Sequence, residues 1–144
     1  MIKRSFSTGI SATGVNIWLL LARVAIGATM LTHGIPKLQK LMAGGELQFA
    51  DPFGIGAGAS LVLVVFAEVV CSVLLIFGLA TRFAVIPLMI TMLVAIFYAH
   101  ASDPFGRKEL PMVLLVLFIG FCIVGAGKYS IDHLLQKKNS RSRY

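Results

Sequence analysis

The chain has 144 residues, of which 58% are hydrophobic and 13% are charged, and its mean hydropathy is +0.89. Soluble domains average about 45–50% apolar and about 25% charged residues, so this composition excludes an ordinary soluble domain. It predicts instead an all-α integral membrane protein in which a single membrane domain covers residues 1–144.

The apolar residues fall into four runs, each close to the roughly 17–25 residues that a membrane-spanning helix needs. The predicted spans, in chain order, are residues 15–35, 59–80, 83–99 and 110–125. Residues 38–58 and 100–109 would then form two loops on the outside, and residues 128–144 a basic tail on the opposite side. The expected fold is a four-transmembrane-helix bundle.

The basic residues are divided unequally between the two sides of this topology. Eight lie at the N-terminus, in the turn between the second and third spans, or in the tail: Lys3, Arg4, Arg82, Lys128, Lys137, Lys138, Arg141 and Arg143. Four lie on the opposite side: Lys37, Lys40, Arg107 and Lys108. The positive-inside rule then places both termini in the cytoplasm. We expect the tail to face lipid and not nucleic acid, because no nucleic-acid-binding fold accompanies it.

One arginine lies within the first predicted span. Arg23 is seven residues inside Asn16, about 10 Å deep, where an unpaired arginine costs several kcal/mol. Glu68 is the one carboxylate inside the four spans, and we therefore predict an ion pair between Arg23 and Glu68. Such a pair could merely fix helix register, or it could form the floor of a polar cavity.

The first span also carries a face that mixes charge with glycine. Arg23, Gly27, Met30, Gly34 and Lys37 follow one another at spacings of four, three, four and three residues, so they share one side of a helix. Glycine on such a face lets another helix or a flat ligand come close. Arg23, Gly27, Gly34 and Lys37 are therefore the candidate cofactor-binding residues.

Two histidines are expected near the outer surface. His33 lies about 80° around the helix from Arg23, and His100 ends the third span at the same level. With Lys37, they would join a polar collar that includes Glu46, Asp51, Asp103 and Glu109. His33, His100 and Glu68 are the candidate catalytic residues, because they could transfer protons. A metal site is not favoured, because no HxxxH or Cys/His spacing occurs.

The outside loops share the sequence Asp-Pro-Phe-Gly, at residues 51–54 and 103–106. The repeat predicts that both loops are seated over the same mouth, although coincidence between two Pro/Gly turns explains it equally well. Cys71 and Cys122 lie inside spans and form no CxxC motif, so we interpret them as small buried apolar residues. A redox-active pair is the less favoured alternative.

Gly125–Leu135, with the sequence GAGKYSIDHLL, predicts the end of one helix and the start of another. Gly125 and Gly127 can end a helix with left-handed backbone, Ser130 can cap the next helix, and Asp132 adds negative charge to its first turn. This segment resembles the signature that closes DoxX-family proteins. Arg23-x-x-x-Gly27, His33-Gly34-x-x-Lys37, Glu68 and Leu79-Ala80-Thr81-Arg82 extend the resemblance, in the right order, over about residues 20–135.

The resemblance implies a multi-pass protein of the bacterial cytoplasmic (inner) membrane. DoxX-like proteins include a subunit of thiosulfate:quinone oxidoreductase, and relatives are linked to thiol and oxidative-stress systems as membrane partners of redox enzymes. The implied function is a quinone-linked oxidoreductase subunit, in which Arg23, His33 or His100 meets the quinone. Because the chain has no redox motif of its own, a soluble or membrane redox partner must supply electrons.

Two other functions remain open. The same cavity could belong to a non-enzymatic binding or transport module for a small anionic or amphipathic molecule, with Arg23 and Lys37 supplying positive charge. Alternatively, the protein could be a structural membrane scaffold. The sequence leaves the oligomeric state open, a homo-oligomer included.

Overall fold

The computed structural model describes residues 9–45 and 48–141, and within these ranges every regular element is a helix. The elements, in chain order, are α2 (Ala12–Ala43), α3 (Ala57–Val65), the π-helical segment η1 (Phe66–Cys71), α4 (Ser72–Phe77), α5 (Thr81–Val94), the π-helical segment η2 (Ala95–Ala99), α6 (Phe105–Val124) and α7 (Ile131–Arg141). Four of the residues named above, Lys3, Arg4, Glu46 and Arg143, lie outside the described residues.

Three helical stretches are long and apolar enough to cross a membrane: Ala12–Ala43, Ala57–Phe77 and Thr81–Ala99. The second combines α3, η1 and α4, and the third combines α5 and η2. They contain the first three predicted spans almost completely, but α2 begins three residues before the predicted 15–35 and ends eight residues after it. The fourth predicted span lies in α6, a 20-residue helix whose first turns hold Arg107, Lys108 and Glu109.

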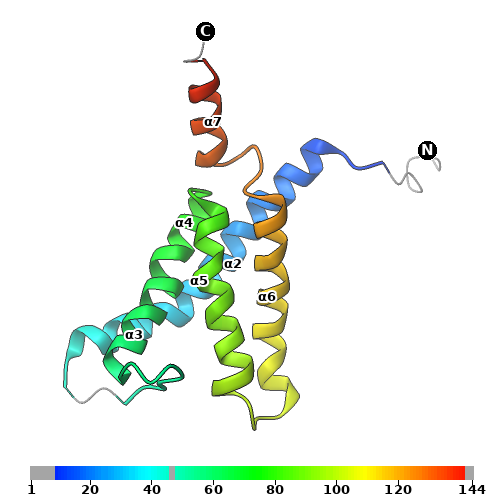
Figure 1. Ribbon diagram of the computed structural model, residues 1–144. Helices are drawn as coiled ribbons and strands as arrows, with labels where there is room; N and C mark the ends of the chain where they lie inside the picture. The colour runs from blue at the N-terminus through cyan, green and yellow to red at the C-terminus, as the bar shows by residue number, and fades with distance from the viewer. Residues whose placement is uncertain (1–8, 46–47, 142–144) are drawn as a thin grey trace.

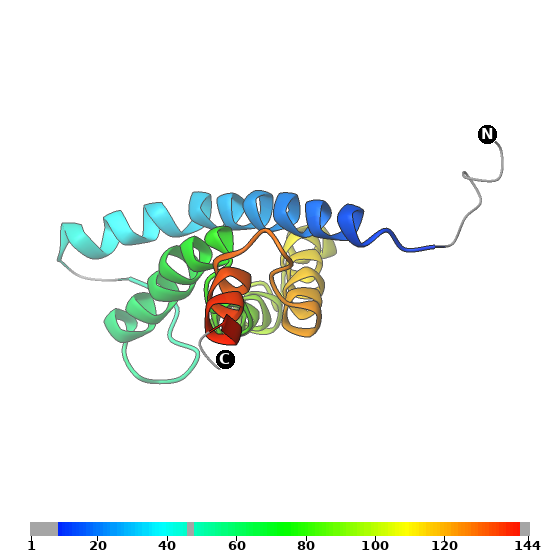
Figure 2. The same cartoon turned by 90° about the horizontal axis from the view of Figure 1, so that it is seen from above.

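The helices pack in sequence order. α2 packs mainly against α4, with further contacts to α3 and η1, and α5 packs mainly against α6. Figure 1 shows α5 and α6 side by side while α2 runs obliquely past them, and Figure 2 shows α2 lengthwise along one side with α5 and α6 nearly end-on. A tilted α2 is still long enough to cross a hydrocarbon core of about 30 Å, because its 32 residues extend about 48 Å.

The buried core is apolar and runs through all the long helices. Its fully buried members include Met30 of α2, Leu75 of α4, Leu88 of α5 and Phe118 of α6. Large apolar side chains also remain exposed along the outer helix faces, for example Phe83 and Val116. A chain that is apolar both inside and outside is expected for a protein surrounded by lipid.

The bundle has two distinct ends. At one, which we call the loop end, α2 finishes and the segments 48–56 and 100–104 connect the helices. At the other, which we call the motif end, the turn 78–80 and the segment 125–130 meet, and α7 projects away from the bundle (Figure 1). The candidate site residues are divided between these two ends.

Candidate functional site

Arg23 points inward, as predicted, but its partner is not Glu68. The residue is completely buried at the motif end. Its Nη2 donates a hydrogen bond to the Tyr129 carbonyl oxygen and its Nε donates, at 3.4 Å, to the Leu19 carbonyl oxygen. The predicted Arg23–Glu68 ion pair is therefore wrong, and so is a polar cavity with that pair as its floor.

The prediction failed because it set the two helices at the wrong relative height. A Cβ atom on Gly78 would lie 1.7 Å from Arg23 Nη1, so the end of α4 at the motif end is level with Arg23 itself. A Cβ on Gly34 would lie 2.9 Å from the Glu68 Cβ, so Glu68 is level with Gly34. Eleven residues of helix, about 16 Å, separate Arg23 from that level.

The glycine-bearing face of α2 is the buried face, as predicted. Arg23, Gly27, Met30 and Gly34 are buried, and Lys37 is partly buried. A Cβ on Gly27 would approach Ile76 Cγ1 to 2.4 Å, and one on Gly34 would approach the Glu68 backbone to 3.0 Å. Both glycines therefore admit a neighbouring helix, which was one of the two predicted uses of this face.

Lys37 and Glu68 form the ion pair of the loop end. The Lys37 ammonium donates hydrogen bonds to both Glu68 carboxylate oxygens, at 2.5 and 2.7 Å. The Glu68 side chain is 5% exposed, whereas that of Lys37 is 32% exposed. Because two of its three N–H donors are used, the lysine keeps one donor for another group, and each carboxylate oxygen can still accept a bond.

This ion pair lies in the wall of a pocket of about 340 Å³. The other walls are almost entirely apolar and come from the loop at residues 49–53, from α3 and from α5. Both π-helical segments contribute as well, η1 through Phe66–Glu68 and η2 through Ala95 and Ala99. π-helical turns are rare and occur often at functional sites, and here two of them face one pocket.

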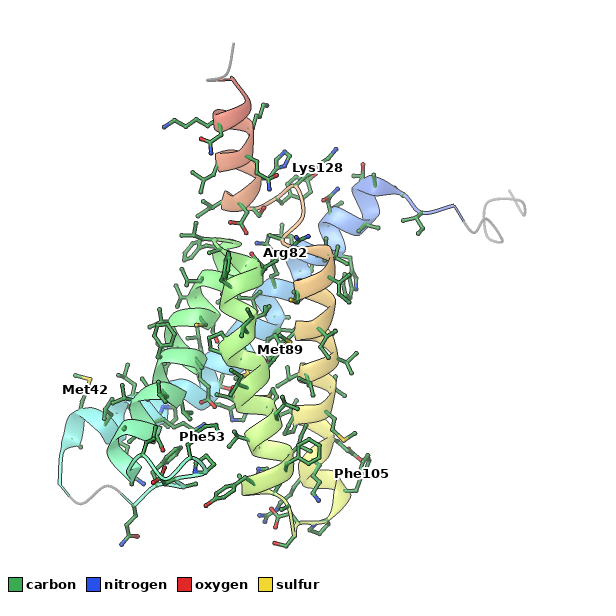
Figure 3. All side chains as sticks on the ribbon, in the orientation of Figure 1. Met42, Phe53, Arg82, Met89, Phe105 and Lys128 are labelled. Atoms are coloured by element: carbon green, nitrogen blue, oxygen red, sulfur yellow. The ribbon has the colours of Figure 1, made fainter. Side chains whose placement is uncertain are left out.

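The loop with the first Asp-Pro-Phe-Gly sequence covers this pocket. Phe49, Pro52 and Phe53 are among its lining residues, and Figure 3 shows Phe53 on the loop beside α3. Asp51 holds the loop in place by accepting hydrogen bonds from Ser60 Oγ at 2.7 Å and from the Gly56 backbone at 2.8 Å. These bonds lower the pKa of the Asp51 carboxyl from its usual value, the Ser60 bond most strongly.

The second Asp-Pro-Phe-Gly sequence has a different role. Asp103 accepts a hydrogen bond from His100 Nδ1 at 2.7 Å and a longer one from Arg107 at 3.4 Å. The His100 bond is the main reason why the pKa of the Asp103 carboxyl is lowered. Residues 103–106 are not among the pocket's described lining residues, so the prediction that both loops cover one mouth holds only for the first.

The predicted catalytic residues are not all brought together. Glu68 lies in the pocket wall, whereas His100 is not among the described lining residues although its neighbour Ala99 is. His33 is exposed on α2 and is not among the described lining residues. Of the candidate cofactor-binding residues, only Lys37 lines the pocket. Gly34 packs against Glu68, and Arg23 lies at the opposite end of the bundle.

The C-terminal motif is hydrogen-bonded to α2 and to the start of α5 at the motif end. Asp132 accepts hydrogen bonds from the backbone N–H groups of Ala80, at 2.7 Å, and Thr81, at 3.0 Å, and so caps α5. Asn16 accepts a bond from the Lys128 backbone at 2.7 Å. The predicted cap by Ser130 is confirmed, because its Oγ accepts a bond from the backbone of His133 in α7. With the Arg23 bond to Tyr129, these contacts give the motif a structural function.

Cys71 and Cys122 are free thiols in the structure. Cys71 belongs to the buried core, and Cys122 packs against that core while remaining partly buried. Their surroundings match the interpretation of both as small apolar residues.

Sequence comparisons agree with the resemblance found in the motifs. The model of the DoxX family matches residues 18–101. The chain is 30% identical over 123 residues to a Bacillus subtilis protein named "Putative oxidoreductase CatD", covering 85% of this chain and 90% of that one. It is 33% identical over 135 residues to the Mycobacterium tuberculosis "Uncharacterized membrane protein Rv3486", covering 81% and 80% of the two chains. An uncharacterized Haemophilus influenzae protein is 30% identical over 131 residues. No solved structure gives a significant match.

Proposed function

Because this chain belongs to the DoxX family of multi-pass membrane proteins, we propose that it binds a quinone in the pocket at its loop end and serves as the quinone-binding subunit of a membrane redox system. The observation that carries this proposal is a mostly apolar pocket of about 340 Å³ with one ion pair, Lys37–Glu68, in its wall. That volume is within the range of small-molecule sites, roughly 300–1,000 Å³.

The walls match the chemistry of a quinone head group. A quinone ring is flat and apolar, with polar atoms only at its carbonyls, so it needs hydrophobic contact and very few hydrogen bonds. Phe49, Phe53 and Phe66 supply aromatic surface. The remaining donor of Lys37 can polarise a carbonyl oxygen, and Glu68 can pass a proton from water to that oxygen when electrons from the partner reduce the quinone.

The ion pair also favours a neutral ligand over an anion. The charge of Lys37 is balanced by Glu68 at 2.5 Å, and Arg23 lies at the other end of the bundle. The pocket therefore has no unbalanced positive charge among its described lining residues with which to attract a carboxylate or sulfate. A binding or transport module for an anionic molecule fits this geometry less well than a quinone-binding subunit does.

Electrons must come from a partner protein. The chain has no CxxC motif, and its two cysteines are packed in or against the apolar core. The name of the Bacillus subtilis relative supports an oxidoreductase system. In this proposal the present chain holds the quinone and moves its protons, and a soluble or membrane partner carries the electron donor.

The proposed topology has four spans, with α6 as the fourth and both termini in the cytoplasm of the bacterial inner membrane. The eight basic residues assigned to the termini and to the turn at residue 82 support this orientation. The pocket then opens near the outer surface, where the protons that quinone reduction takes up can enter from water.

The test is quinone binding by the purified full chain in a non-ionic detergent. We expect quinone in organic extracts of the preparation, and we expect decylubiquinone to bind in calorimetric titrations. Lys37→Met and Glu68→Gln should each weaken binding about 3- to 10-fold, as expected for the loss of one hydrogen bond.

The matched control is the double change Lys108→Met/Glu109→Gln, which removes the same charges at the same end outside the pocket. It should leave the affinity unchanged. Absence of both extracted quinone and decylubiquinone binding would overturn the proposal. Binding without quinone reduction in the presence of a redox partner and its electron donor would favour the non-enzymatic binding module.

A further inference from the structure

The motif end contains a second hollow, which the proposed function does not use. It is a groove of about 670 Å³ between α7 and the ends of α5 and α6. Arg82 and Lys128 are among its lining residues, and Figure 3 shows Lys128 beside α7 and Arg82 below it. We propose that this groove binds the headgroup of an anionic phospholipid, and that Arg82 and Lys128 hold its phosphate.

The groove lies where the apolar surface of the bundle ends. Phe83, 77% exposed, and Val124, 56% exposed, lie in its wall at the adjoining ends of α5 and α6. Leu135 of α7, 48% exposed, contributes on the other side. Apolar side chains beside a basic groove match a phospholipid, whose acyl chains leave the phosphate at the boundary between hydrocarbon and water.

Among its described lining residues, the groove has two side chains with positive charge and one with negative charge. Asp132 is its one carboxylate among the described lining residues, and both of its oxygens already accept backbone hydrogen bonds from Ala80 and Thr81. Arg82 donates from Nη2 to the Ile123 carbonyl oxygen at 3.2 Å, which leaves its other N–H groups available. Lys128 is exposed, so its ammonium can turn toward a ligand.

These features favour an anionic lipid over other occupants. A zwitterionic headgroup would bring an ammonium group next to Arg82 and Lys128, whereas an anionic headgroup brings no positive charge to them. A soluble acidic protein would not reach Phe83 and Val124, which continue the lipid-facing surfaces of α5 and α6.

Native mass spectrometry of the delipidated full chain with equal amounts of phosphatidylglycerol and phosphatidylethanolamine tests this proposal. We expect phosphatidylglycerol to be retained preferentially. The double change Arg82→Gln/Lys128→Gln should weaken its binding about 10- to 30-fold, since each basic group near the surface contributes about a fivefold effect. The matched control, Arg107→Gln/Lys108→Gln at the loop end, should change it less than about twofold.

Because Arg82 also bonds to the backbone of α6, its replacement can change stability as well as lipid binding. The exposed Lys128 side chain makes no such bond, so Lys128→Gln alone tests lipid binding separately from stability. It should weaken phosphatidylglycerol binding about fivefold and leave the melting temperature unchanged. Equal retention of the two lipids, or equal effects of the two double changes, would overturn the proposal. So would displacement of phosphatidylglycerol by inorganic phosphate, which would indicate a small-anion site, or by polyglutamate, which would indicate a protein-binding surface.

Discussion

Lys37 and Glu68, 31 residues apart in the sequence, form an ion pair at the loop end of the bundle, in which the lysine ammonium donates to both carboxylate oxygens. Breaking a buried pair costs about 3–5 kcal/mol, and one-third exposure of Lys37 lowers our expectation to about 1–3 kcal/mol. The coupling in a Lys37→Ala/Glu68→Ala double-mutant cycle should therefore be at least about 1 kcal/mol. Unfolding in mixed micelles measures it.

The corresponding cycle for Arg23→Ala and Glu68→Ala is the control. These residues lie at different levels of the bundle, so their effects on the free energy of unfolding should add within about 0.5 kcal/mol. Additive effects for Lys37 and Glu68, or strong coupling between Arg23 and Glu68, would contradict the pairing described here.

Gly34 sets how closely α2 approaches η1. Gly34→Ala would bring a Cβ to 2.9 Å from the Glu68 Cβ and to 3.0 Å from its backbone. We expect a loss of about 1–3 kcal/mol of stability, because the backbone must move to relieve the clash, and we expect weaker decylubiquinone binding. Thermal unfolding and calorimetry measure the two effects.

Gly120 provides the matched control within α6. A Cβ there meets no atom within 4 Å, so Gly120→Ala should be neutral or should stabilise the helix by up to about 1 kcal/mol. If Gly34→Ala behaved like Gly120→Ala, the close approach of the two helices would not be required.

Asp132 caps α5 from a distant part of the chain. Asp132→Ala should lower stability by about 1–2 kcal/mol, because the N–H groups of Ala80 and Thr81 lose their acceptors. Ala80 has a positive φ of 49°, which favours glycine, so Ala80→Gly should instead raise stability by up to about 1 kcal/mol. Thermal unfolding compares them, and a stable Asp132→Ala variant would show that the cap is dispensable.

Asp51 makes the loop over the pocket sensitive to acid. Its pKa is lowered in the folded state, so the bonds to Ser60 and Gly56 add stability above the unfolded pKa of about 3.9. That contribution is lost as the pH falls through the folded pKa. We expect proteolysis of the loop to increase at pH values below about 4.

Asp51→Asn should increase loop cleavage already at neutral pH, because the amide cannot accept the same bonds as the carboxylate. Loop cleavage in this variant should also depend much less on pH than in the original protein. An unchanged cleavage profile in Asp51→Asn would assign the acid effect to other carboxylates.

The sequence predicted the helices well because their signals are local. Hydrophobic runs of membrane-spanning length located the first three spans, and the spacing of Arg23, Gly27, Met30 and Gly34 identified the buried face of α2. The cap by Ser130 was predictable because hydroxyl side chains are preferred at the N-terminal cap of a helix.

The pairing of charges was not predictable in the same way, because it depends on the relative height of two helices. Arg23 donates from Nε and Nη2 to the backbone carbonyls of Leu19 and Tyr129, and no side-chain pattern marks a carbonyl acceptor. Once Gly78 is placed beside Arg23, Glu68 comes within reach of Lys37.

The pocket was also missed, for two reasons. Phe49 and Phe53 looked like ordinary loop residues, and only the Asp51 bonds show why their loop lies over the pocket. The π-helical turns at Glu68 and before His100 change which side chains face inward, and we find no sequence signal for either turn.

The central claim is that quinone occupies the pocket lined by Lys37 and Glu68. Photolabelling of the full chain with an azido-quinone, followed by peptide mapping, tests it most directly. The label should appear in residues 49–53 and 63–68, and excess decylubiquinone should remove it. A label spread along the lipid-facing sides of α2 and α6, or concentrated at the motif end, would contradict the claim.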